Sequence, residues 1–128
     1  MEKQEFIRKQ LELSQRIIQQ NYPLPPNKIQ QKNKHEIVTP IDNRIEKEIK
    51  QNIEHTYPEH NIVGEETGQT KNNSNYTWIL DPIDGTTNYA HNIPFFCTAI
   101  RLLYKQKPLH AGIIQHITND VWLATRNQ

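Results

Sequence analysis

The sequence predicts an α/β fold in which two N-terminal helices pack on a largely antiparallel sheet. Apolar residues recur at helical spacing over residues 2–20 and again after Thr39. From residue 61 onward, the chain instead carries short segments rich in β-branched and aromatic residues. Short turns separate the last three segments, which favours an antiparallel meander. The 128 residues suffice for one domain.

The first helix is expected over residues 2–20. Its apolar stripe consists of Phe6, Ile7, Leu11, Leu13, Ile17 and Ile18. A cluster of prolines ends the helix, and a polar loop follows over residues 27–36.

The second helix is expected to begin at Thr39–Pro40 and to stop at Tyr57–Pro58. Thr39 suits the N-cap, Pro40 suits the first helical position, and Asp42 can reach back to the cap. The predicted buried edge has i, i+4 spacing and consists of Ile41, Ile45, Ile49 and Ile53. Glu46 and Lys50 are expected to form an exposed pair on the other side.

Five strands are expected in the rest of the chain. Their ranges are 61–65, 76–81, 95–104, 109–117 and 121–125. In the fourth, alternation places Ile113 and Ile117 on one face and leaves His110 and His116 facing solvent. Two helices cannot cover such a sheet completely, so the chain is expected to be incomplete or to need a partner.

Composition excludes several classes of function. Fifteen basic and fourteen acidic residues give a net charge of +1, so no direct nucleic-acid binding is expected. No apolar stretch reaches the roughly 18 residues of a membrane helix, and no signal sequence is evident. A single cysteine, Cys97, excludes a disulfide within the chain and favours the cytoplasm.

Carboxylates gather where two predicted strands end. Asp81 ends one strand, and Asp84 follows three residues later, before Gly85 and Thr86. Glu65 and Glu66 stand at the end of another strand. Several carboxylates at strand ends suit a hard cation such as Mg²⁺. Asp-Pro-x-Asp-Gly is also ordinary turn chemistry, so residue types alone leave both interpretations open.

Three ordered motifs resemble those of the inositol monophosphatase family of Mg²⁺-dependent phosphatases. They are DPIDGTTNYAHNIPF at 81–95, GEE at 64–66 and EIVTPID at 36–42, where Glu36 replaces the family's first Asp. The resemblance runs from about residue 8 to the end of the chain. It implies a layered α+β sugar-phosphatase-type fold, of which residues 1–128 would be the N-terminal half.

The resemblance also implies a metal site. Asp81 would bridge two Mg²⁺ ions, and Glu65 and the backbone carbonyl of Ile83 would bind the first ion. Asp84 would bind the second ion. Glu66 belongs to the motif but is not expected to bind metal directly.

Substrate and water would be handled by neighbouring residues. Gly85 and Thr86 would give backbone N–H groups to the phosphate, and the substrate-contacting set would also include Glu65, Ile83 and Asp84. Glu65 and the Thr86 hydroxyl, with Asp42 as its partner, would activate the attacking water. Lys32 stands near the place of a family lysine that approaches the site.

The implied activity is hydrolysis of a phosphorylated polyol or sugar, with inositol monophosphate favoured and a homodimer as a candidate assembly. Family members are roughly twice as long, and their second half carries a Trp-Asp motif that completes the second metal site. A chain with half of the site is expected to be inactive or weakly active. Two alternatives remain: a non-catalytic interaction or regulatory protein, and a degenerate fragment.

Overall fold

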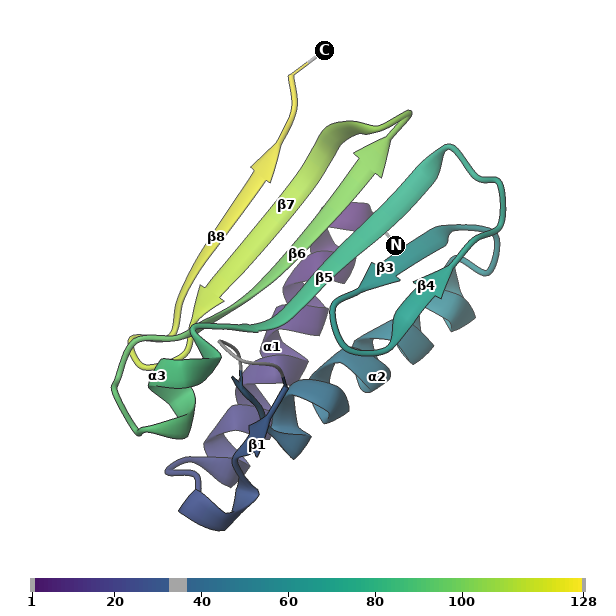
Figure 1. Ribbon diagram of the computed structural model, residues 1–128. Helices are drawn as coiled ribbons and strands as arrows, with labels where there is room; N and C mark the ends of the chain where they lie inside the picture. The colour runs from purple at the N-terminus through teal and green to yellow at the C-terminus, as the bar shows by residue number, and fades with distance from the viewer. Residues whose placement is uncertain (1, 33–36, 128) are drawn as a thin grey trace.

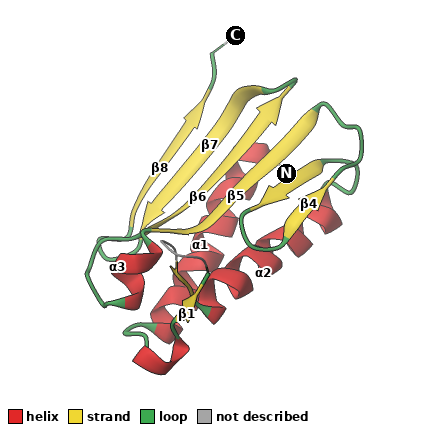
Figure 2. Ribbon diagram, viewed as in Figure 1, coloured by secondary structure: helices red, strands yellow, loops and turns green. Residues whose placement is uncertain are grey.

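Two long helices lie on one face of a six-stranded sheet in the computed structural model, which describes residues 2–32 and 37–127 (Figures 1 and 2). The predicted α/β layering is therefore confirmed. The predicted correspondence of Glu36 lies outside the described residues. No helix in the described ranges has the length and apolarity to cross a membrane.

Helix α1 spans Lys3–Asn21, close to the expected range. Its apolar stripe packs on the sheet, and Ile7 and Leu11 are fully buried. Three polar side chains of the same helix are buried as well: Gln10, Ser14 and Gln15.

Helix α2 spans Pro40–Thr56 and begins with the predicted capping box. The Thr39 hydroxyl accepts the N–H groups of Ile41 and Asp42 at 3.2 and 3.4 Å. Asp42 Oδ2 accepts the N–H of Thr39 at 2.9 Å and its hydroxyl at 2.7 Å. The four predicted isoleucines are buried. The predicted exposure of Glu46 is wrong, because this carboxylate is fully buried.

The segment expected to be a plain loop contains short elements. A 3₁₀ helix, η1, spans Pro26–Lys28. Strands β1 (Gln30–Gln31) and β2 (Ile37–Val38) then form a small antiparallel pair.

The main sheet has the strand order β4-β3-β5-β6-β7-β8. The strands are β3 (Asn61–Gly64), β4 (Gly68–Thr70), β5 (Tyr76–Asp84), β6 (Cys97–Tyr104), β7 (Lys107–Gln115) and β8 (Asp120–Thr125). The predicted meander over β6, β7 and β8 is confirmed, and β3 pairs in parallel with β5. Strand β4 was not predicted. A short helix, α3 (Thr86–Ala90), follows β5.

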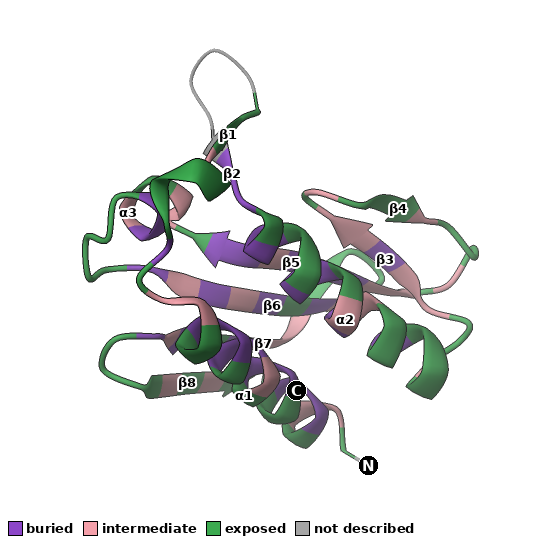
Figure 3. Cartoon of the chain, turned by 90° about the horizontal axis from the view of Figure 1, so that it is seen from below, coloured by how far each residue is buried: buried purple, intermediate pink, exposed green. Residues whose placement is uncertain are grey.

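The core lies between the helices and one face of the sheet. Trp78 and Leu102 from the sheet are fully buried there, as are the isoleucines of α2. Figure 3 shows the buried positions of α1 and α2 on the sides that face the strands.

The opposite face of the sheet is open and partly apolar. Asp81, Ala99, Ile113 and Trp122 are cross-strand partners in sequence across β5 to β8, so they share this face. Ile113 is 41% exposed and Trp122 is 56% exposed. The predicted solvent exposure of His116 is wrong, because its side chain is hydrogen bonded to Gln15 of α1 and is only 5% exposed.

Candidate functional site

The acidic motifs meet because β3 and β5 are parallel neighbours. Gly64 pairs with Leu80 in the register of these two strands. The next residues are Glu65, which follows β3, and Asp81, which lies within β5, so they are neighbours at the same end of the two strands. The sequence predicted both strands, and their parallel pairing is what brings the two carboxylates together.

Asp81 is the most strongly perturbed carboxylate in this cluster. Its Oδ1 atom is buried and has no hydrogen-bond partner, the one such side-chain atom among the described residues. Burial, hydrogen bonding with the Glu65 carboxyl and the charges of Glu65, Asp84 and Asp42 raise the pKa of Asp81 to about 7. A bound cation would give this buried acceptor a partner and would reduce the repulsion between the neighbouring negative charges.

Asp84 is the last residue of β5, three residues after Asp81. The register between β5 and β6 shifts between Asp81 and Asp84, and the Asp84 side chain is exposed. Within the described ranges, no three His, Cys, Asp or Glu residues are grouped closely enough to hold a metal ion as they stand. The structure thus joins Glu65 to Asp81 and leaves Asp84 at the rim.

Thr86 and Asp42 form the second part of the site. The Thr86 hydroxyl is 2.9 Å from Asp42 Oδ1 and 2.9 Å from the carbonyl oxygen of Ile83. A hydroxyl has one proton, so it donates to one of these oxygens at a time. Burial raises the pKa of Asp42, and hydrogen bonds from Thr39 and Thr86 partly offset that rise. The pairing of Thr86 with Asp42 is the one expected from the sequence.

Gly85 makes the turn between β5 and α3. Its φ of 91° lies in the left-handed region, which favours glycine. An added Cβ would lie 3.2 Å from the carbonyl oxygen of Phe95. The turn therefore needs glycine both for its backbone conformation and for its close approach to the next segment.

Lys32 lies beside the acidic motif. Its Nζ is 2.9 Å from Glu66 Oε1 and 3.6 Å from Glu65 Oε1. Burial raises the pKa of Glu66, while the hydrogen bond and charge of Lys32 oppose that rise. The lysine thus offsets part of the negative charge next to Glu65.

Sequence reasoning missed Glu46, which joins α2 to the acidic motif. Its carboxylate accepts the N–H of Glu66 at 3.0 Å and, through a short hydrogen bond, the N–H of Thr67. The signal was present, because Glu46 is four residues after Asp42 and therefore lies on the same face of the helix.

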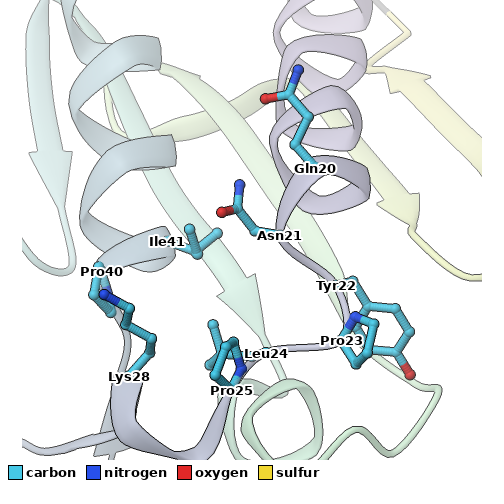
Figure 4. A pocket seen from close by; sticks show the side chains of 9 residues that line it. All are labelled: Gln20, Asn21, Tyr22, Pro23, Leu24, Pro25, Lys28, Pro40 and Ile41. Carbon is cyan, nitrogen blue, oxygen red and sulfur yellow. The ribbon is translucent and has the colours of Figure 1, made fainter.

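The cavity in Figure 4 is separate from the acidic cluster. It has a volume of about 390 Å³ and lies between the end of α1 and the start of α2. Three prolines, at positions 23, 25 and 40, contribute to its wall. Its lining includes none of the carboxylates described above.

Proteins of known family are similar to this chain in sequence and in fold. The Escherichia coli K12 protein named Nus factor SuhB is 32% identical over 114 residues, which are 88% of this chain and 43% of the relative. An inositol monophosphatase from Mesembryanthemum crystallinum is 33% identical over 116 residues, with the same coverage. The crystal structure of the suhB protein from Bartonella henselae has a TM-score of 0.89 at 26% identity, covering 96% of this chain and 48% of that one.

These matches share one feature. The chain spans less than half the length of the curated relatives just described. The family model for inositol monophosphatases nevertheless matches residues 3–128, almost the whole chain. On this match and these relatives, the chain belongs to the inositol monophosphatase family.

Proposed function

We propose that this chain contributes a Mg²⁺ site to the hydrolysis of phosphate monoesters. The observation that carries the proposal is the buried, unpartnered Asp81 Oδ1 beside Glu65. Carboxylate and carbonyl oxygens are the ligands that Mg²⁺ prefers. Asp81, Glu65 and the Ile83 carbonyl would hold the ion, and Asp84 would serve a second one. Bound there, Mg²⁺ would supply charge neutralisation and a more acidic water.

The remaining residues have separate tasks. Thr86 holds a hydroxyl between Asp42 and the Ile83 carbonyl, so it can orient a water molecule and pass a proton toward Asp42. The elevated pKa of Asp42 suits a proton acceptor. Gly85 and Thr86 would offer backbone N–H groups to the phosphate at the start of α3.

Calorimetric titration of the purified chain with Mg²⁺ tests the site. Saturable binding is expected in the wild type and should be lost in Asp81→Asn, which keeps the shape but removes the charge. Asp120→Asn is the matched control, because Asp120 is an exposed aspartate at the start of β8. Absence of Mg²⁺ binding in the wild type, or equal Mg²⁺ binding in Asp81→Asn, would contradict the proposal.

The proposed substrate class is a phosphorylated polyol or sugar, with inositol monophosphate as the first candidate. The support is family membership and a relative named inositol monophosphatase. Phosphate release from inositol monophosphate at saturating Mg²⁺ tests it, with Thr86→Val to remove the hydroxyl. Release by the wild type that Thr86→Val does not slow would contradict the role given to Thr86.

A non-catalytic role in a protein complex is the second candidate. The open sheet face with exposed Ile113 and Trp122 favours it, and one relative is named a Nus factor. Sedimentation of the wild type and Trp122→Ser tests whether this face drives association. A monomeric wild type that captures no partner in a pull-down would count against this role.

A further inference from the structure

We propose that Glu46 is a positioning residue, which fixes the loop carrying Glu65 so that the loop can share a cation with Asp81. The inference rests on the proposed Mg²⁺ site. It starts from a carboxyl side chain that is fully buried on α2. Glu46 is 0% exposed and lies on α2 between the core residues Ile45 and Ile49.

Among the described residues, this carboxylate is hydrogen bonded to the two backbone N–H groups that directly follow Glu65. Both of its oxygens lie 3.0 Å from the N–H of Glu66, and Oε2 also accepts the N–H of Thr67. Hydrogen bonds to a carboxylate are stronger than those between neutral groups. They hold the backbone immediately after Glu65, and therefore restrict where the Glu65 side chain can point.

The fit between helix and loop is close. An added Cβ at Gly64 would lie 2.6 Å from Glu46 Oε2 and 2.7 Å from its Cδ. The last residue of β3 is thus a glycine at the point where the Glu46 carboxylate contacts the strand. The first residue of the GEE motif gains a physical role, since it makes room for Glu46.

One helix face serves both parts of the site. Asp42 and Glu46 are four residues apart on α2 and both are buried. Asp42 bonds Thr86 after β5, and Glu46 bonds the loop after β3. The rigid spacing of one helical turn therefore sets the position of one loop relative to the other.

Glu46→Gln tests the proposal, with Glu48→Gln as the matched control. Gln keeps the shape and one acceptor oxygen but turns an amide NH₂ toward backbone N–H groups. Glu48 is on the same helix, is partly exposed and pairs with Arg44, so the control makes the same chemical change outside the site. Loss of a residue that orients metal ligands typically weakens metal binding about 10- to 100-fold.

Three measurements are made on each variant: Mg²⁺ affinity by calorimetry, amide hydrogen exchange at Glu66 and Thr67, and thermal unfolding. Glu46→Gln is expected to bind Mg²⁺ about 10-fold more weakly than the control and to exchange these two amides faster. A lower unfolding temperature with unchanged Mg²⁺ affinity would show a purely structural role and overturn the inference.

A second variant covers the case in which Glu46→Gln does not fold. Gly64→Ala keeps the carboxylate but displaces it, and the same loss of Mg²⁺ affinity is expected. Unchanged affinity in a folded Gly64→Ala overturns the inference as well. If the wild type itself binds no Mg²⁺, the proposed function fails, and the role of Glu46 toward a cation fails with it. The wild-type titration therefore separates the two failures.

Discussion

Acid should destabilise this protein through His116. The ring lies in the layer between α1 and the sheet, and burial lowers its pKa from 6.5 to about 4. Its Nδ1 is hydrogen bonded to the Gln15 side chain, and its Nε2 is 2.7 Å from the Thr98 hydroxyl. Protonation would place a charge in this enclosed position.

The magnitude follows from the two pKa values. The folded state keeps the ring neutral down to about pH 4, whereas the unfolded chain takes up a proton near pH 6.5. The unfolded state binds more protons in this interval, so stability falls as the pH falls. At about 1.4 kcal/mol per pH unit, the loss between pH 6.5 and pH 4 amounts to about 3 kcal/mol.

Urea unfolding from pH 4 to pH 8 measures this loss, with His116→Gln to remove the titrating group. The variant will be less stable at neutral pH, but its free energy of unfolding should fall less steeply between pH 6.5 and pH 4. His91→Gln is the control, since His91 is exposed. Equal pH slopes in the wild type and His116→Gln would refute the reasoning.

Two further changes test backbone features beside the site. Thr39→Ala removes the helix cap and should lower the free energy of unfolding by about 1 kcal/mol in urea, and an unchanged value would contradict the capping role. Gly85→Ala should cost more than the about 1–2 kcal/mol of a left-handed backbone, because the added Cβ also meets the carbonyl oxygen of Phe95. Gly68→Ala is its control, because Gly68 has a φ of 82° with nothing within 4 Å of an added Cβ. A loss at Gly85 no larger than at Gly68 would exclude a steric role for Phe95.

Local signals explain why much of the fold could be predicted. The capping box at Thr39 and the isoleucine spacing of α2 depend only on neighbouring residues, and both appear in the structure. The short strand β4 was missed because Gly68–Thr70 contains no apolar residue, and it forms by pairing with β3. Its existence depends on a partner rather than on its own sequence.

The buried face of β7 could not be predicted from alternation alone. Hydrophobicity favours Ile113 as a core residue, yet the other face of the strand packs on α1. Gly112 makes that packing close, since an added Cβ would lie 2.5 Å from Ile7 Cγ2. His116 is buried on this side because Gln15 and Thr98, both distant in sequence, bond its ring. The sequence pattern carries no information on those partners.

The start of α2 shows how folding and the proposed chemistry share the same atoms. Asp42 uses Oδ2 to complete the cap with Thr39 and Oδ1 to hold the Thr86 hydroxyl. The carboxylate is 1% exposed, so neither role leaves it free to turn. A residue that only capped the helix could face solvent, and one that only contacted Thr86 could lie on a loop. Because Asp42 does both, the position of Thr86 is fixed relative to the start of the helix. One helical turn later, Glu46 holds the backbone of Glu66 in the same way. The geometry of the candidate site is therefore determined by how α2 begins and packs.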